Sequence, residues 1–271
     1  MNDFDHKKTI WRVVTFSVLV TAAAWVAPLL GGSPASPEPG FILWGTAPLL
    51  VSIIIRVATR DWSDLGAKPD IRKNIGWYLV SLLALPILML LTLLVGVLLS
   101  LSSVSDFSAG KFLQTFLTAL PIFFIFAIFE EVGWRGYLSP KLDSLGLNRF
   151  LASAIVAVVW ATWHLPYIRE LTWVYSSEDL AGFIPRFYLV CFAFSIIFGE
   201  LRNLTGTFWS AVLIHAVGNA FGHPLAAEYI RYAAGMEFLA SISNGLILVV
   251  LAGLLGITVN RWRSAHMPID G

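Results

Sequence analysis

The sequence has 271 residues, of which 57% are hydrophobic and only 13% are charged, and its formal net charge is +1. Together with a mean hydropathy of +0.76, this composition is typical of an integral membrane protein and excludes an ordinary water-soluble domain. The near-neutral charge provides no field that would attract nucleic acid. We therefore expect the lipid bilayer, and no nucleic acid, among the partners.

Apolar windows recur along the whole chain, and each is close to the length of about 17–25 residues that a helix needs to cross the hydrocarbon core. Short polar connections rich in Gly, Pro, Ser and Asp separate them. Residues 1–271 therefore predict one membrane domain of the all-α class, a polytopic bundle of about eight transmembrane helices. The predicted spans cover residues 11–30, 41–58, 76–101, 112–136, 150–165, 184–200, 207–222 and 239–260.

The basic residues orient this bundle, because cytoplasmic ends of membrane proteins hold an excess of Lys and Arg. With eight spans and a cytoplasmic N-terminus, fourteen of the 18 Lys and Arg residues fall on the cytoplasmic side. The other four are Lys111, Arg169, Arg186 and Arg231. We therefore predict a multi-pass protein of the inner or plasma membrane with both termini in the cytoplasm.

The fourth span carries two adjacent acids in the sequence F-E-E-V-G-W-R. Glu131 and Arg135 are four residues apart with the acid first, which is the favoured geometry for a helical ion pair. Glu130 is rotated by about 100° from Glu131 on a helix, so it is the carboxylate left for chemistry. Intramembrane acids are costly and are functional by default.

Two later spans add polar side chains at a similar depth. The fifth span ends in W-A-T-W-H and places Trp160 and His164 on one helix face; the seventh contains H-A-V-G-N, with His215 and Asn219 one turn apart. Singly, each motif is compatible with interhelical hydrogen bonding. Together they predict one polar, water-holding cavity, and we expect its mouth on the cytoplasmic side.

These residue types suit hydrolysis of a carbonyl compound. A partly buried carboxylate beside an imidazole can act as the general base that activates a water molecule. A second imidazole and an amide can donate hydrogen bonds to the developing oxyanion. Cys191 is the only cysteine, which excludes an internal disulfide, and we interpret it as a small buried apolar residue. Attack by water is therefore favoured over attack by an enzyme nucleophile.

The three motifs, E-E-x-x-x-R, aromatic-x-x-x-His and H-x-x-x-N, resemble those of the CPBP intramembrane protease family, which includes the type II CAAX prenyl endopeptidases and bacterial self-immunity and bacteriocin-processing proteins. The resemblance covers roughly residues 112–222, the predicted catalytic core, and D-L-G at 64–66 is similar to an upstream loop of bacterial members. It implies a glutamate-dependent endopeptidase, without cofactor, acting on a membrane-associated or lipid-modified, CAAX-like peptide.

The resemblance also implies a role for each matched position. Glu130 would activate the hydrolytic water with help from His164, and His215 with Asn219 would form the oxyanion hole. Glu131 would pair with Arg135 to hold the fourth helix. Trp160 departs from the Phe that is usual in the prenyl endopeptidases, and we interpret it as part of the cavity wall.

Three alternatives stay open at this stage. Carboxylates and two His residues can ligate zinc, although an Asn in the fourth place is a poor ligand and favours a site without metal. A non-catalytic membrane immunity or scaffold protein of the same family would keep the motifs for packing. A proton-coupled transporter would also use intramembrane Glu and His, but the sequence shows no similarity between its two halves.

Overall fold

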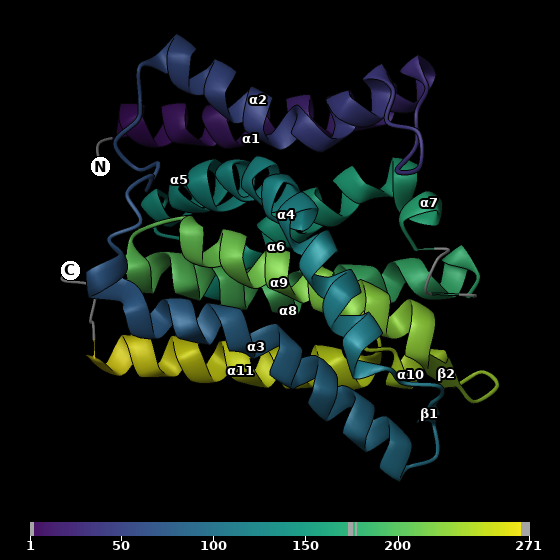
Figure 1. Cartoon of the computed structure of the whole chain (residues 1–271). Helices are drawn as coiled ribbons and strands as arrows, with labels where there is room; N and C mark the ends of the chain where they lie inside the picture. The colour runs from purple at the N-terminus through teal and green to yellow at the C-terminus, as the bar shows by residue number, and fades with distance from the viewer. Residues whose placement is uncertain (1–2, 173–175, 177, 267–271) are drawn as a thin grey trace.

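The structure is a computed structural model that describes residues 3–172, 176 and 178–266. It is an all-α bundle of long antiparallel helices, which confirms the predicted fold class (Figure 1). Within this described part, the one sheet is the antiparallel pair β1 (Ser102–Val104) and β2 (Ile230–Tyr232). The long helices are α1 (Asp3–Val26), α2 (Pro39–Thr59), α3 (Ile71–Leu98), α4 (Ala109–Gly133), α6 (Arg149–His164), α8 (Leu180–Thr205), α9 (Trp209–Pro224) and α11 (Leu246–His266).

Short helical segments connect or extend these long helices. Two of them, η2 (Trp134–Leu138) and η4 (Leu225–Tyr229), are π-helical turns that follow α4 and α9 without a break. The others are η1 (Ala27–Leu30), α5 (Ser139–Ser144), η3 (Leu165–Tyr167), α7 (Ile168–Thr172) and α10 (Glu237–Ala240).

Each of the eight predicted spans overlaps one of the long helices. Seven helical segments in the described residues are long and apolar enough to cross a membrane. The helix at the predicted span 207–222, α9, is not among them. Most of its residues are buried, so α9 is a central helix wrapped by the others.

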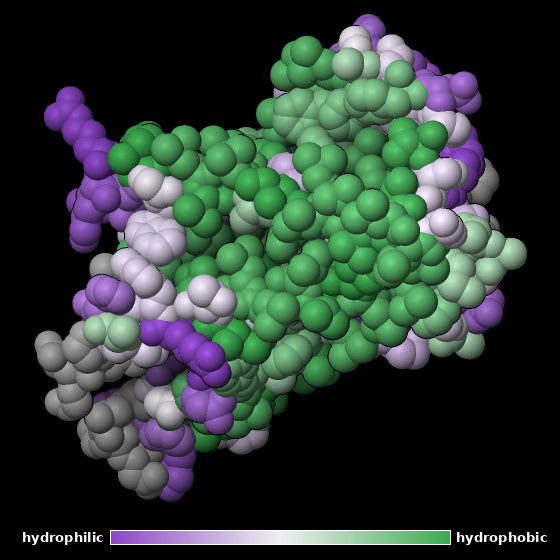
Figure 2. All heavy atoms as spheres, turned by 90° about the horizontal axis from the view of Figure 1, so that it is seen from below, coloured by the Kyte–Doolittle hydropathy of each residue, from purple (hydrophilic) through white to green (hydrophobic). Residues whose placement is uncertain are grey.

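The two ends of the bundle differ in composition. α1 begins and α11 ends at the same end of the molecule (Figure 1), as an even number of passes requires. Figure 2 shows a broad apolar belt between two polar ends on the face seen from below. The fourteen Lys and Arg residues that the sequence assigned to one side belong to helix segments and connections toward the end with the termini. We call this end the basic end and the opposite one the distal end.

α4 approaches its neighbours closely just after the two acids. It packs against α2 and α9, and a Cβ atom added to Gly133 would lie 2.8 Å from the carbonyl oxygen of Pro48 in α2. Only glycine permits this approach, because real Cβ atoms do not come so near to backbone atoms. The glycine of the E-E-x-G segment therefore brings the polar level of α4 against α2.

The π-helical turn η2 follows directly and is held by two guanidinium groups from other helices. A π turn displaces backbone carbonyls from their α-helical partners. Arg56 of α2 donates a hydrogen bond to the carbonyl of Gly136, and Arg202 of α8 donates one of 3.0 Å to the carbonyl of Arg135. Arg56 and Arg202 also bind the side chain and the carbonyl of Asp64, respectively, in the D-L-G segment. This segment thus anchors the turn beneath the acids.

Lys141 completes the charged cluster at the basic end. Its Nζ atom lies 2.7 Å from carboxylate oxygens of both Asp61 and Asp64, and Asp61 also pairs with Arg12 of α1 at 2.8 Å. Burial raises the pKa of Asp61, but Lys141, Ser63 and Arg12 outweigh this effect and hold that pKa below its usual value. The loop between α2 and α3 is therefore tied to α1 and α5.

Candidate active site

A cavity of about 340 Å³ lies inside the bundle, lined by residues of α2, α3, α4, α6, α7, α8 and α9. Five polar or aromatic side chains predicted for the site line it: Glu130, Trp160, His164, His215 and Asn219. They come from three helices that are distant in sequence. The remaining walls are mainly aromatic and aliphatic, from residues that include Phe41, Trp44, Phe126, Phe187, Phe194 and Phe198. The predicted cavity with these polar side chains is thus present, within walls that are mainly apolar.

Glu130 is held by hydrogen bonds from two indole groups. Nε1 of Trp160 donates to Oε2 of Glu130 at 2.8 Å, and Nε1 of Trp134 donates to the same oxygen at 3.4 Å. Its other oxygen, Oε1, lies 3.8 Å from Nε2 of His215. The side chain is 6% exposed, so one carboxylate oxygen is fixed by Trp160 while the other faces the cavity side of His215.

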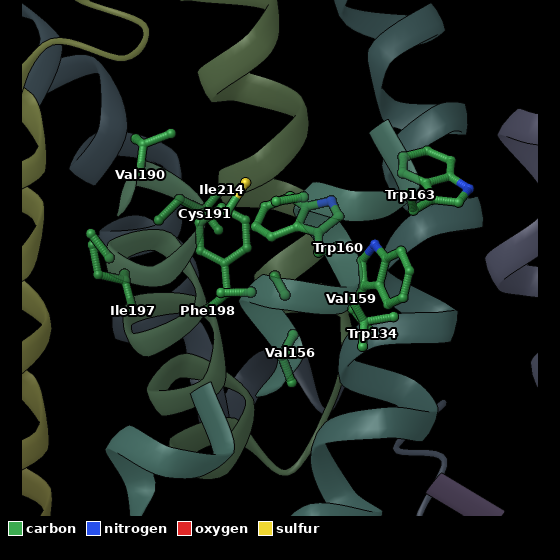
Figure 3. Packing of buried hydrophobic residues seen from close by; sticks show 14 of the residues in the cluster. Trp134, Val156, Val159, Trp160, Trp163, Val190, Cys191, Ile197, Phe198 and Ile214 are labelled. Atoms are coloured by element: carbon green, nitrogen blue, oxygen red, sulfur yellow. The ribbon is translucent and has the colours of Figure 1, made fainter. Parts of the chain in front are cut away.

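Trp160 therefore does more than the cavity-wall role predicted for it. Phenylalanine, the usual residue at this motif position, has no hydrogen-bond donor, whereas the indole N–H binds the carboxylate. Trp134 was not predicted as a site residue. It lies one helical turn after Glu130, and this spacing, which places both side chains on one helix face, could have indicated the contact. Figure 3 shows the rings of Trp160 and Phe198 side by side, with centroids 6.0 Å apart.

Glu131 lies beneath the cavity and binds two partners. Arg135 donates two hydrogen bonds of 2.9 Å to its carboxylate, in the predicted i,i+4 pair, and both side chains are fully buried. The same carboxylate lies 2.9 Å from Nδ1 of His215 on α9. The sequence did not indicate this second contact, because it depends on how α9 packs against α4. Glu131 thus orients His215 as well as α4.

Arg135 is also enclosed by aromatic rings. Its guanidinium carbon lies 4.7 Å from the ring centre of Trp160 and 4.8 Å from that of Phe198, distances typical of cation–π contacts. The cation therefore links the buried acid Glu131 to the indole that holds Glu130.

His164 ends α6 and is half-buried at the cavity wall. Its Nδ1 atom lies 2.9 Å from the carbonyl oxygen of Trp160, so a protonated Nδ1 donates there and leaves Nε2 as the acceptor of the neutral ring. Trp44, Trp163 and Phe187 pack around the ring. The imidazole is therefore fixed in orientation.

Asn219 and Cys191, which the sequence analysis considered as polar or reactive residues, also line the cavity. Asn219 is half-buried and lies one turn beyond His215 on α9, with both side chains at the cavity. Cys191 is buried at the wall formed by α8, as expected for a small apolar residue. Within the described residues, no group of three or more His, Cys, Asp and Glu side chains is arranged to hold a metal ion.

The cavity lining extends toward the distal end of the bundle. Its lining extends from Glu130 to Pro34, Thr172 and Ser243, in segments that connect helices at the distal end. The termini lie at the opposite end (Figure 1). The lining therefore extends away from the basic end, and the cytoplasmic position of the cavity mouth stays a prediction.

Comparison with known proteins points to the same segment. A family model described as "Type II CAAX prenyl endopeptidase Rce1-like" matches residues 112–221, which contain every residue proposed from the motifs. Over these residues the chain is similar to the type II CAAX prenyl endopeptidases. This confirms the family predicted from the three motifs.

A curated relative of this core is known from Methanococcus maripaludis. The chain is 33% identical over 131 residues to a protein named "CAAX prenyl protease 2", and the match covers 45% of this chain and 47% of the relative. The chain thus matches about half of the length of this relative.

Proposed function

We propose that this chain is an intramembrane endopeptidase that uses Glu130 to activate water and hydrolyses a peptide bond of a membrane-associated or lipid-modified substrate. The observation that carries the proposal is the carboxylate of Glu130, fixed by Trp160 and next to His215 at the wall of an otherwise apolar cavity. The name of the relative supports a CAAX-like, prenylated substrate. An apolar pocket suits a lipid-modified or apolar peptide.

In the proposed reaction, Glu130 removes a proton from water as the oxygen attacks the carbonyl carbon of the scissile bond. His164 orients this water through Nε2, since its Nδ1 faces the backbone of Trp160. When the tetrahedral intermediate collapses, the carbon–nitrogen bond breaks and Glu130 returns the proton to the leaving amine. The step produces one carboxylate and one amine and needs no co-reactant.

His215 and Asn219 are proposed to stabilise the oxyanion. Because Nδ1 of His215 faces Glu131, its Nε2 donates to the oxyanion only when both ring nitrogens carry protons. The carboxylate of Glu131, itself neutralised in part by Arg135, balances the charge of that imidazolium. The amide of Asn219 adds a second donor one turn further along the cavity.

Removing either donor should slow cleavage while the substrate still binds. We expect Asn219→Ala and His215→Gln each to lower kcat by about 10²–10³-fold, the usual effect of losing an oxyanion donor, with a much smaller change in KM. Steady-state cleavage by the purified variants measures this split. A rise in KM with unchanged kcat would instead identify these residues as substrate-binding groups.

Replacing Trp160 with Phe tests the departure from the usual motif. Hydrogen bonds to charged groups contribute about 1.5–3 kcal/mol, so Trp160→Phe should lower kcat by at least about tenfold, because Glu130 loses its 2.8 Å donor. Trp77→Phe is the control, since this indole packs against Trp262 away from the cavity. Equal activity of wild type and Trp160→Phe would show that the ring acts only as a wall.

Metal independence is part of the proposal and has its own test. We expect cleavage by the purified protein to be unchanged after prolonged treatment with a strong chelator, with no stoichiometric zinc found by elemental analysis. Loss of activity that added zinc restores would instead assign Glu130 and the two imidazoles as ligands.

The substrate is to be found by comparing membrane peptides from cells that produce the wild-type protein or Glu130→Ala. Fragments present only with the wild type identify the cleaved bond. Identical peptide profiles at equal protein levels would contradict the proposed activity in that host.

A further inference from the structure

We infer that His223 and Ser243 form a second polar subsite of the cavity, which binds the C-terminal carboxylate of the substrate peptide. That the substrate is a peptide rests on the proposed function. The subsite itself rests on the cavity lining, on the spacing of the polar residues of α9 and on a buried hydroxyl group without a partner.

The polar pattern of α9 continues for one turn beyond Asn219. His223 follows at the same spacing, so that the segment reads H-x-x-x-N-x-x-x-H, and residues four apart lie on one helix face. His215, Asn219 and His223 all line the cavity. At about 1.5 Å per residue, His223 lies about 12 Å along the helix axis from His215. α9 therefore presents a further polar group to the cavity, away from the acids of α4.

The imidazole of His223 is set among apolar side chains. Its ring packs edge to face against Phe123 of α4, with ring centres 5.1 Å apart. Leu85 and Met89 of α3 pack on the two glycines of the H-A-V-G-N-A-F-G-H segment, and both also line the cavity. A ligand that reaches His223 from the level of His215 therefore passes along apolar walls, and its polar group must bind at the far end.

A second polar group lines the cavity from the connection between α10 and α11. This is Ser243, whose buried Oγ atom has no hydrogen-bond partner within the part of the chain that the structure describes. Thr172, in contrast, also lines the cavity but donates to the carbonyl oxygen of Ile168 at 2.7 Å. α9 ends, and the connection lies, at the distal end of the bundle (Figure 1). Because a buried hydroxyl without a partner is costly, Ser243 points to a ligand that supplies the missing bond.

These two groups suit a carboxylate. A carboxylate in an apolar pocket needs hydrogen-bond donors, because its burial without them is costly. An imidazole N–H and a serine hydroxyl are donors, and hydrogen bonds to a charged acceptor are the strong ones. Among the described residues that line the cavity there is no Lys or Arg. His223 is therefore the basic group that a carboxylate can reach away from Glu130.

The spacing determines which carboxylate of the peptide binds here. An extended chain advances about 3.3 Å per residue, so the distance of about 12 Å along α9 corresponds to three or four residues. With the attacked carbonyl at His215 and Asn219, the carboxylate at His223 belongs to the third or fourth residue after the cleaved bond. A cavity of about 340 Å³ holds only a short segment of this kind, so we assign the carboxylate to the end of the chain.

A matched set of peptides tests the subsite. The probe is an N-acetylated tetrapeptide of S-farnesyl cysteine, valine, isoleucine and leucine, with either a free C-terminal carboxylate or a C-terminal amide. A third peptide has the amide and aspartate in place of leucine. Equilibrium binding is measured with detergent-solubilised full-length protein that carries Glu130→Gln, so that no turnover is needed. Cleavage rates are measured with protein that retains Glu130.

Four further substitutions are compared in both forms of the protein. We expect the free acid to bind at least about tenfold more tightly than the amide, the effect of a hydrogen bond to a charged group. His223→Phe should reduce this ratio to about one, whereas Ser243→Ala and His223→Gln, which each retain one donor group or an N–H, should reduce it only in part. His266→Phe is the control, since this exposed imidazole stacks on Trp262, and it should keep the full ratio.

Several results would overturn the subsite: equal binding of the acid and the amide, no binding of either, or an unchanged ratio in folded His223→Phe. If His223→Phe does not fold, an unchanged ratio in both His223→Gln and Ser243→Ala overturns it instead. Tighter binding of the aspartate peptide than of the free acid would overturn the assignment to the end of the chain. A lack of hydrolysis leaves the binding ratios in place, whereas equal cleavage of the acid and the amide contradicts the subsite and not the proposed hydrolysis, so the two failures are distinguishable.

Discussion

Replacing Glu130 with Gln should reduce peptide cleavage by at least about 10³-fold in purified, detergent-solubilised protein. The amide keeps the size and an oxygen that accepts the hydrogen bond from Trp160, but it does not take a proton from water. General-base catalysis typically contributes 10²–10⁴-fold, and loss of the charge next to His215 adds to the effect. Initial cleavage rates on the peptide identified in cells provide the measurement.

Glu170→Gln is the matched control for this experiment, because Glu170 is an exposed acid on α7 and does not line the cavity. It should cleave at the wild-type rate. Both variants should elute as folded protein with the same thermal midpoint as the wild type. If Glu130→Gln keeps full activity, the hydrolytic mechanism is contradicted; if cells keep their phenotype with it, the immunity or scaffold alternative is supported.

The sequence located the long helices and several residues that line the cavity, because both depend on local patterns. Apolar windows of membrane length locate each long helix, and i,i+4 spacing alone identifies the pair Glu131–Arg135. The same spacing places His215 and Asn219 at one cavity. Exclusion of charge from lipid then singles out Glu130.

What the sequence did not predict depends on contacts between helices. The contact of Glu131 with His215 requires α4 and α9 to pack with one particular rotation, and helical periodicity does not determine that rotation. The extent of the cavity was not predicted for a related reason: depth along a helix locates the polar side chains but not how far the lining continues, here to Pro34, Thr172 and Ser243. At the other end of the bundle, the ion pairs of Lys141 in α5 with Asp61 and Asp64 of the α2–α3 loop also depend on contacts between distant segments.

The second large effect concerns the buried pair itself. Arg135→Met should lower the free energy of unfolding by about 3–5 kcal/mol, because Glu131 is then left as a fully buried charge without its cation. We expect the thermal midpoint in detergent to fall by about 10 °C. Lys111→Met, which breaks an exposed pair with Glu228, is the control and should leave the midpoint unchanged.

A double-mutant cycle separates the stabilising role of this pair from its role at His215. Combining Glu131→Gln with Arg135→Met removes both charges, while the amide oxygen introduced at position 131 still accepts from Nδ1 of His215, so much of the lost stability should return. Activity should stay at least about tenfold below wild type, because the imidazolium that serves the oxyanion lacks its balancing carboxylate. Recovery of stability and activity together would show that Glu131 acts only by holding α4. Recovery of stability alone assigns it to the positioning and charge balance of His215, and thus explains why two adjacent acids are kept at this depth.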